Sequence, residues 1–518
     1  MISLSKFRLF PVWLSAMTLF FSGCGSLPKD YAKSPSHALS DTHDTRLASS
    51  VIPLISQHFD KSGFYPLGSG LDAFIARVAL IDAAERSLDL QYYIWHVDDT
   101  GLILIQRIIA AADRGVRVRL LLDDLDTAGK EIGLQTLNTH PNIEVRLFNP
   151  FVYRQARLFD FVTDLKRINR RMHNKSLTAD NQITIIGGRN IGNEYFEAAG
   201  EAVFADLDVL SIGKVVKQVS SAFDLYWNSD WSFPVSAFVD GPVVESEFQI
   251  VREYLDRQLR QLSGSDFAVA LRKADFSQRL HRGELDIFWG SARLVYDAPE
   301  KILAETVSDE THIGPQMFSY IDQVEDELIV ITPYFVPNDR LVNYFGRLVS
   351  RGVRVRILTN SLASNDVTLV HAGYRRYRKS LLQKGVELYE FKHSALSQNP
   401  SPSGRWSGSS RASLHAKVFG VDRLGIFIGS FNLDPRSIKL NTEMGVWFKS
   451  KDLGVQLGDR FDHSLNESAY RLVLDGSSLK WLGMENGQQV QFTTDPHTSW
   501  WKRFSNWLLS LVVIESML

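Results

Sequence analysis

The sequence is poor in cysteine, since Cys24 is the only one among 518 residues, and no disulfide can form within the chain. It also lacks a G-x-x-x-x-G-K-[ST] motif, which excludes a P-loop and disfavours an ATP-driven reaction. The formal net charge is −2, so nothing attracts the whole chain to nucleic acid, and a nuclease is disfavoured. No group of His, Cys, Asp and Glu has metal-ligand spacing, so we expect neither a metal nor another cofactor.

Long apolar runs are scarce as well. The longest near the start, Leu9 to Phe21, follows Lys6 and Arg8 and is shorter than the roughly 20 residues that span a bilayer. It fits the apolar part of a signal peptide, which we predict at residues 1–23.

Cys24 follows this run in "FSGCGS", which resembles a bacterial lipobox, whose cysteine becomes the lipidated first residue of the mature chain. We therefore expect a lipid-anchored protein of the bacterial cell envelope that faces the periplasm. By resemblance to known lipoproteins, Gly25 favours the outer membrane. An uncleaved leader with an incidental cysteine is the alternative. The polar, Ser- and Pro-containing residues 24–50 are predicted to form a tether.

The composition is otherwise that of an ordinary globular protein, 44% hydrophobic and 22% charged, and beyond residue 50 helical and strand patterns alternate. This alternation predicts parallel βαβ units. The hexapeptide R-G-V-R-V-R at 114–119 returns at 351–356, an offset of 351−114 = 237. We predict two duplicated α-β-α halves, residues 51–289 and 290–518, packed about a pseudo-two-fold axis around one site.

A nine-residue frame, H-x-K-x4-D, is repeated at nearly the same offset, 415−173 = 242. Its residues are His173, Lys175 and Asp180 in the first half and His415, Lys417 and Asp422 in the second. On an extended segment, residues i and i+2 share a face, so each half directs one imidazole and one ammonium group into the same space. The aspartates fall where the strands turn, which favours a structural role for them.

With the subsequent G-G-R-N and G-S-F-N, both frames resemble the signature of the phospholipase D superfamily, H-x-K-x4-D-x6-G-[SG]-x-N. "HNKSLTADNQITIIGGRNIGNEYF" and the terminal "WWKRFSNWLLSL" are similar to bacterial cardiolipin synthases of the C type. The resemblance implies the duplicated phospholipase D fold and counts Asp180 and Asp422 with the catalytic set. It favours His173 as nucleophile and His415 as acid, which the two matched frames do not decide by themselves.

These residue types suit phosphodiester exchange. One neutral imidazole attacks phosphorus to give a phosphohistidine, and the other, protonated, gives its proton to the leaving alkoxide. Lys175 and Lys417 are placed to neutralise the nonbridging oxygens, and no metal is needed. Further hydrogen bonds to the phosphate are expected from Asn190, Ser430 and Asn432.

Two glutamates lie at equal distances after the histidines, because 201−173 and 443−415 are both 28. In this superfamily an acidic residue near that place orients the imidazole, so we predict this role for Glu201 and Glu443. Glu194 is a rival in the first half, and ordinary surface carboxylates are the alternative.

The resulting hypothesis is a phosphatidyltransferase that makes cardiolipin-type lipid, with phospholipids and a membrane surface as its partners and no nucleic acid. A hydrolase that releases phosphatidic acid is the main alternative, then a nuclease and a non-catalytic binding protein. The C-terminal "WWKRFSNWLLSLVVI" is expected either in a membrane interface or packed on the second half. The sequence names no donor lipid, oligomeric state or helper protein.

Overall fold

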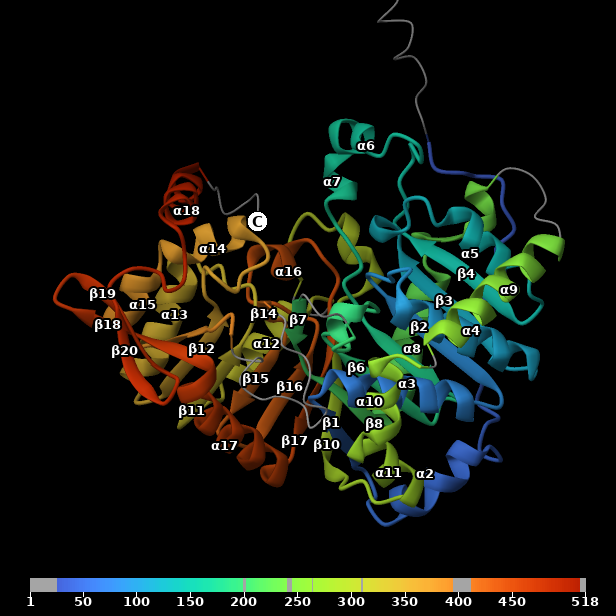
Figure 1. The fold of residues 1–518 in the computed structure, drawn as a ribbon, viewed down its shortest axis with the longest axis horizontal. Coiled ribbons are helices and arrows are strands. Elements are labelled where there is room, and N and C mark those ends of the chain that lie inside the picture. The colour runs from blue at the N-terminus through green and yellow to red at the C-terminus, as the bar shows by residue number, and fades with distance from the viewer. Residues whose placement is uncertain are drawn as a thin grey trace, which may run out of the picture.

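The repeated hexapeptide leads into equivalent strands of the two halves, β3 (Arg117–Asp123) and β12 (Arg354–Asn360). The computed structural model describes residues 26–198, 202–239, 245–262, 264–308, 311–394 and 411–512. Its two halves lie side by side, the first mostly blue to green and the second mostly yellow to red (Figure 1). The predicted duplication is therefore confirmed.

In the first half, β2, β3 and β4 run parallel, as predicted, and the neighbouring strands are antiparallel. The spatial order is β9 (Ser232–Pro234), β4 (Ile143–Phe148), β3, β2 (Ser87–Tyr92), β5 (Ser176–Ala179), β6 (Ile183–Gly187), β8 (Asp208–Gly213) and β1 (Ser62–Leu67).

The second half repeats this order strand for strand and adds two strands at its outer edge. The order is β20 (Gln488–Phe492), β19 (Ser478–Glu485), β18 (Ala469–Asp475), β13 (Glu387–Phe391), β12, β11 (Glu327–Ile331), β15 (Val418–Val421), β16 (Gly425–Gly429), β17 (Met444–Lys449) and β10 (Phe288–Tyr296).

The two half-sheets join where β1 pairs with β10, with Ser62 opposite Gly290 and Phe64 opposite Phe288. The Phe64 ring also stacks on Phe448 at 4.3 Å, within an apolar cluster that contains strands of both halves. Burial of apolar surface between equivalent edges is how a two-fold pair is stabilised. Strand β10 spans residues 289 and 290, so the predicted boundary between the halves falls inside it.

Helices cover both faces of each half-sheet. Alternate strand residues point to opposite faces, and apolar side chains on both faces pack against helices. Leu120 and Leu122 of β3 join the cluster of α3 and α4, whereas Leu121 between them joins that of α8. In the first half the helices are α2 (Arg46–Ser56), α3 (Gly70–Ala83), α4 (Asp99–Asp113), α5 (Glu131–Leu137), α6 (Leu158–Thr163), α7 (Leu165–Ile168), α8 (Lys214–Asn228), α9 (Glu245–Leu262), α10 (Asp266–Lys273) and α11 (Asp275–Arg282).

The second half is covered in the same way, with Ile357 in the cluster of α12 and α13 and Leu358 in that of α17. Its helices are α12 (Ile313–Ile321), α13 (Asp339–Ser350), α14 (Thr368–Arg375), α15 (Arg378–Gln383), α16 (Pro435–Lys439), α17 (Lys451–Ser468) and α18 (Trp500–Val512). Within the described residues, no helix has the length and apolar character needed to cross a bilayer.

Ordered structure begins earlier than the sequence predicts. The predicted tether lies on the first half, where the Ser34 and Ser36 carbonyls accept hydrogen bonds from Arg146 and Arg119 at 2.7 and 2.8 Å. Helix α2 already begins at Arg46. Backbone carbonyl contacts leave no apolar pattern in a sequence, which is why composition indicated a free linker. The predicted signal peptide and Cys24 lie outside the described residues.

Candidate active site

His173 is held by the second half of the molecule. Its backbone N–H donates to the Thr442 carbonyl at 2.8 Å, and its Nδ1 lies 2.8 Å from Oε2 of Glu443. The imidazole is buried and meets the Tyr93 ring edge-on, 4.9 Å between centroids. With Nδ1 fixed on a carboxylate, Nε2 is the ring nitrogen left for chemistry.

His415 is held in the same way by the first half. Strand β14 (Arg411–Leu414) pairs in parallel with β7 (Ala202–Ala205), and the His415 N–H donates to the Ala205 carbonyl at 2.8 Å. Its Nδ1 lies 2.6 Å from Oδ2 of Asp206. Each imidazole is therefore oriented by a carboxylate of the opposite half, and neither half has a complete site alone.

The carboxylate of Glu443 fits its predicted role, although the histidine it contacts is that of the other half. Ser430 and Ser437 donate hydrogen bonds to it at 2.5 and 2.8 Å. Burial raises the pKa of Glu443 to about 7, against the opposing effect of the Lys175 ammonium.

The counterpart of Glu443 is Asp206, which sequence reasoning missed. Glu201, the residue predicted from spacing, lies outside the described residues. The first half has 206−173 = 33 residues between histidine and acid and the second has 28, so counting from the histidine overlooks a five-residue difference. The register of the strands makes the two acids equivalent, because Asp206 and Glu443 each lie two residues before the partner of the motif glycine, Asp208 opposite Gly187 and Gly445 opposite Gly429. Glu194, the rival, instead lies 3.2 Å from Nδ1 of His96.

Burial disfavours the charged form of Asp206, yet the His415 imidazole and the Lys417 ammonium hold its pKa well below the usual range. A Cβ at Gly188 would lie 2.3 Å from Oδ1 of Asp206, so this carboxylate needs glycine beside it. Among the fixed positions of the signature, only this one differs between the two motifs, and the second half has Ser430 there, whose hydroxyl donates to Glu443.

Both lysines are buried beside their histidines. Lys175 Nζ donates to the His173 carbonyl at 2.7 Å, and Lys417 Nζ donates to the His415 carbonyl at 2.5 Å. Lys417 Nζ also lies 3.2 Å from Nε2 of His415, so ammonium and imidazole face the same space. Burial lowers the pKa of Lys417 to about 8 and holds that of Lys175 well below its usual range.

The electrostatic environment favours neutral imidazoles. Burial lowers the pKa of His173 well below its ordinary value, and Lys175, Lys417 and His415 lower it further. Burial and Lys417 also lower the pKa of His415, but the Asp206 carboxylate opposes that shift. The charges of both H-x-K sets thus affect the pKa of His173, which is expected when both sets occupy one site.

Asp180 and Asp422 shape turns. Asp180 accepts hydrogen bonds from the backbone N–H groups of Glu85, Arg86 and Ser87, the shortest at 2.7 Å. Asp422 accepts equivalent bonds from residues 325–327. Both adopt positive φ, at 50° and 52°. These bonds fit the structural role that the turn preference favours, since the carboxylates tie each hairpin to the strand beside it. The placement of Asp180 and Asp422 in the catalytic set stays a prediction.

The residues expected to contact phosphate already have protein partners, with one exception. Asn190 donates to the Tyr195 hydroxyl at 2.9 Å, and the Ser430 hydroxyl donates to Glu443. Asn432 is buried, and its Oδ1 has no hydrogen-bond partner among the described atoms. Asn432 is thus the residue of this set that a substrate would satisfy.

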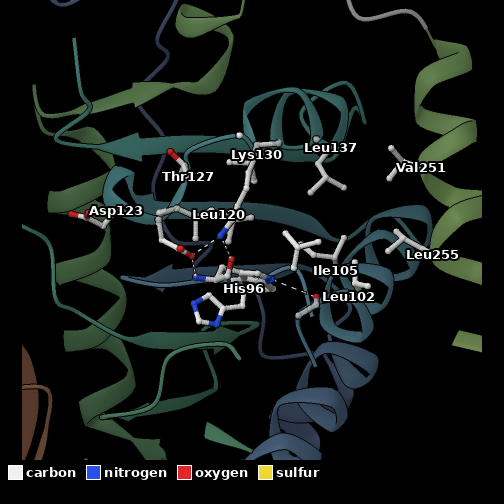
Figure 2. A pocket seen from close by; sticks show the side chains of 18 of the residues that line it. His96, Leu102, Ile105, Leu120, Asp123, Thr127, Lys130, Leu137, Val251 and Leu255 are labelled. Carbon is white, nitrogen blue, oxygen red and sulfur yellow. Dashed lines mark hydrogen bonds and ion pairs between the residues drawn. The ribbon is translucent and has the colours of Figure 1, made fainter. Parts of the chain in front are cut away.

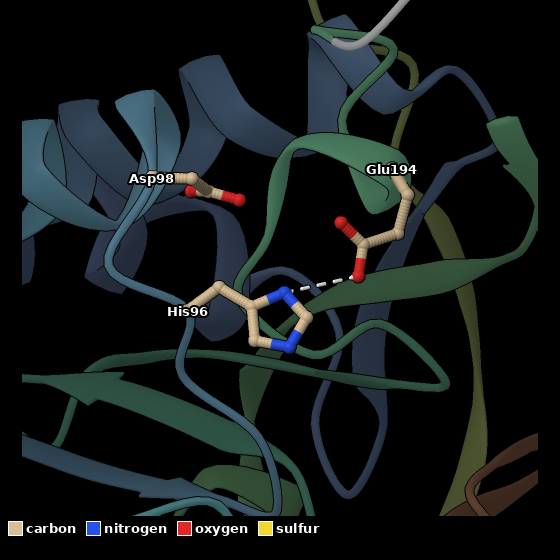
Figure 3. A group of neighbouring side chains, drawn as sticks. All are labelled: His96, Asp98 and Glu194. Atoms are coloured by element: carbon tan, nitrogen blue, oxygen red, sulfur yellow. Dashed lines mark ion pairs between the residues drawn. The ribbon is translucent and has the colours of Figure 1, made fainter. Parts of the chain in front are cut away.

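A group of ligand-type side chains, His96, Asp98 and Glu194, lies beside the site (Figure 3). Asp98 caps helix α4 by accepting from the N–H of Gly101 and also accepts from the N–H of Asn193, at 3.1 and 2.7 Å. Asp98 is therefore held by these hydrogen bonds, and His96 and Glu194 are held by their own ion pair. Contacts within the protein thus explain why the three side chains lie together.

An apolar cavity of about 280 Å³ adjoins the site, with Tyr93 forming part of its wall. Figure 2 shows Leu102, Ile105 and Leu137 facing Val251 and Leu255 of α9 across this space. Polar side chains are concentrated at the other end of the lining, namely His96, Thr127 and Lys130, the last paired with Asp126 at 2.6 Å. Such a lining suits a hydrocarbon chain with a polar end.

This fold, with one site in which each histidine is paired with a carboxylate of the opposite half, defines a member of the phospholipase D superfamily. A sequence model described as "Cardiolipin synthase, PLD-like domain" matches residues 78–227 and 317–465. The chain is 43% identical to cardiolipin synthase C of Escherichia coli (strain K12) over 91% of this chain and 100% of that one. It is 24% identical to cardiolipin synthase B of Escherichia coli O6:H1 over 84% of each chain.

Among solved structures, phosphatidylserine synthase of Haemophilus influenzae Rd KW20 has the same fold, with a TM-score of 0.54. It is 14% identical to this chain, over 78% of this chain and 86% of that one. The protein belongs to the phospholipase D-like family that contains the bacterial cardiolipin synthases.

Proposed function

We propose that the protein is a phosphatidyltransferase that makes cardiolipin-type phospholipid by phosphodiester exchange. The observation that carries the proposal is the pair of buried His–Lys sets in one site, each imidazole fixed by a carboxylate of the opposite half. The cardiolipin synthases among its relatives support the lipid product.

In the first step, Nε2 of His173 attacks the phosphorus of a donor phospholipid. The bond from phosphorus to the headgroup oxygen breaks as the phosphorus–nitrogen bond forms, and His415 gives its proton to the leaving alkoxide. The low pKa of His173 favours the neutral nucleophile, and the charged Asp206 stabilises a proton on His415. Lys175 and Lys417 offset the charge that develops on the nonbridging oxygens.

In the second step, a hydroxyl of phosphatidylglycerol attacks the phosphorus, and its proton passes to His415. The phosphorus–nitrogen bond breaks and His173 returns to its starting state. One phosphodiester has replaced another, so the exchange is close to neutral in energy and needs no nucleotide. The cavity beside Tyr93 receives an acyl chain of the substrate.

The protein works at a bacterial membrane. Lipidation of Cys24 would tether it in the cell envelope, facing the periplasm, with the outer membrane favoured by Gly25. Such a tether confines the enzyme near its lipid substrate and raises the effective substrate concentration.

The direct test of the intermediate uses a donor that is labelled in its phosphatidyl group and carries a headgroup able to leave without protonation. The His415→Ala enzyme can then form the intermediate but breaks it down slowly. We expect a phosphatidyl group on the peptide that contains His173. Label on residue 415 in a His173→Ala enzyme would reverse the assignment, and label on neither would refute covalent catalysis.

A hydrolase of the same fold is the second candidate, because water instead of an alcohol would resolve the same intermediate. The buried site disfavours it, since both imidazoles are almost fully enclosed. Product analysis with and without added phosphatidylglycerol separates the two, because only a transferase converts the acceptor.

A further inference from the structure

Helix α18 presents an apolar face to solvent. Trp501 is 70% exposed, and its neighbours on the helix share this exposure although apolar side chains of this size are normally buried. The exposed residues are Trp500, Trp501, Phe504, Trp507, Leu508 and Leu511. Trp500 and Phe504 stack at 5.1 Å, so the face forms one continuous aromatic surface.

The orientation of this helix is fixed by polar contacts on its other side. Asn506 is fully buried, lies 3.2 Å from Nδ1 of His371, and donates to the Thr368 carbonyl at 3.0 Å. Arg375 of α14 donates to the Arg503 carbonyl at 3.2 Å. The aromatic face therefore points away from the molecule because the polar face is bound to α14.

A second apolar surface lies on α6 and α7 of the first half. Val162 is 84% exposed, and the exposed apolar residues of the pair are Leu158, Phe159, Phe161, Val162 and Leu165. The segment is also fixed from beneath. The buried carboxylate of Asp160 accepts from the N–H groups of Val152 and Tyr153, each at 2.9 Å.

Both surfaces project at the same edge of the molecule, α18 from the second half and α6 with α7 from the first (Figure 1). The described chain also begins at this edge, at Ser26, two residues after Cys24. Two residues reach about 7 Å, so a lipid on Cys24 would enter a membrane at that edge.

Both surfaces are connected to the site by short segments. Helix α7 ends at Ile168, five residues before His173. Helix α14, which binds α18, begins two residues after Asp366. The Asp366 carboxylate accepts a hydrogen bond from the Tyr334 hydroxyl at 2.8 Å, and its charge raises the pKa of Lys417. The two apolar surfaces therefore flank the catalytic residues.

We propose that α18 together with α6 and α7 forms a docking surface that inserts into the interfacial region of a phospholipid bilayer. Tryptophan is favoured at the level of lipid headgroups, and an amphipathic helix with an aromatic face lies in that plane. The inference rests on the proposed function in two respects, that the bilayer supplies the substrate and that Cys24 carries a lipid. Docking at both sides of the site lets a lipid headgroup reach His173 while the lipid stays in the bilayer.

The test compares full-length protein with two sets of variants, Trp501→Ser with Leu508→Ser on α18, and Leu158→Ser with Val162→Ser on α6. Phe59→Ser is the matched control, because Phe59 is 85% exposed and follows three residues after α2, the helix at the opposite edge of Figure 1. Each protein is assayed on phosphatidylglycerol–phosphatidylethanolamine vesicles and on short-chain phospholipid below its micelle concentration.

We expect each set to lower kcat/KM on vesicles about tenfold and to leave turnover of the monomeric lipid within about twofold. The control should change neither. Equal loss on both substrates at an unchanged melting temperature would overturn the docking surface. If the unmodified enzyme turned over neither lipid, the proposed function would fail, while a direct measurement of bilayer contact would still decide the inference.

That measurement reconstitutes the protein in vesicles with brominated lipids, which quench tryptophan fluorescence on contact. Replacing Trp500, Trp501 and Trp507 by Phe keeps the face apolar and should remove most of the quenching. Unchanged quenching would show that the face stays out of the bilayer. A dimer that the serine variants dissociate, without quenching, would instead assign the surface to a second copy.

Discussion

At the scale of single residues, the site is chemically asymmetric although it is duplicated. Asp206 has a depressed pKa and is charged, whereas burial brings the pKa of Glu443 to about 7. The two histidines therefore have different partners. His415 contacts a carboxylate that is ionised at neutral pH, whereas His173 contacts a carboxylate whose pKa is close to neutral pH. This difference supplies a physical reason for different roles in acid–base chemistry.

The first prediction concerns these carboxylates. Asp206→Asn and Glu443→Gln should each lower kcat by about 10²- to 10⁴-fold, because each imidazole loses the charge that fixes its tautomer and its orientation. KM for the donor lipid should change much less. The control is Asp208→Asn, which alters the buried Arg77 ion pair and not a histidine. Parallel loss of folding stability in all three variants would contradict a positioning role.

The second prediction is a bell-shaped dependence of kcat/KM on pH. Attack needs neutral His173, so the rate falls as pH drops through a pKa that lies below the ordinary histidine value. Catalysis also needs protonated His415, whose pKa Asp206 raises against burial and Lys417, and charged Lys417, whose pKa is about 8, so the rate also falls as pH rises. Lys417→Arg should lower the rate but move the alkaline limb upward. An unmoved limb would assign it to another group.

At the scale of elements, the two hairpins that carry the motifs are tied down by Asp180 and Asp422. We expect Asp180→Ala to lower the free energy of unfolding by about 3 kcal/mol, because three backbone N–H groups, that of buried Ser87 among them, lose their acceptor. Activity per folded molecule should stay within about threefold. Denaturant unfolding and single-turnover assays measure the two effects, and a large kcat loss in stable protein would place Asp180 in the catalytic set.

The cavity between α4, α5 and α9 allows a test that adds atoms and causes no clash. A Cβ at Gly133 would meet nothing within 4 Å, and this residue lines the cavity. Gly133→Leu should raise KM for long-chain phospholipid about tenfold, by displacing methylene groups worth about 0.8 kcal/mol each, and leave short-chain lipid unaffected. Ile132→Leu on exposed α5 surface is the control. Equal effects on both lipids would place the acyl chain elsewhere.

The alternation of helices and strands was enough to predict the parallel strands β2, β3 and β4 and the duplicated design. The spacing did not predict that each histidine pairs with a carboxylate of the opposite half. Five extra residues precede Asp206, so the equal spacing after the two histidines indicates Glu201 instead. Tyr93 and Tyr195, whose rings meet those of His173 and His415 edge-on, belong to no motif in the sequence. These contacts depend on how the halves pack, which the local pattern does not specify.

At the scale of the whole molecule, the pseudo-two-fold arrangement is the condition for activity. The backbone N–H of each motif histidine donates to a carbonyl of the opposite half, that of Thr442 for His173 and that of Ala205 for His415. The seam between β1 and β10 joins the two half-sheets in one register. Separation of the halves would therefore remove both orienting carboxylates at once, and a single half is expected to have no activity.

The central claim is that the duplicated site makes cardiolipin-type lipid. The most direct measurement is mass spectrometry of lipids from a bacterial strain that lacks cardiolipin and expresses this chain, beside His173→Ala and His415→Ala versions. We predict cardiolipin with the intact chain and none with either variant. Phosphatidic acid without cardiolipin, or cardiolipin that persists in the variants, would contradict the account.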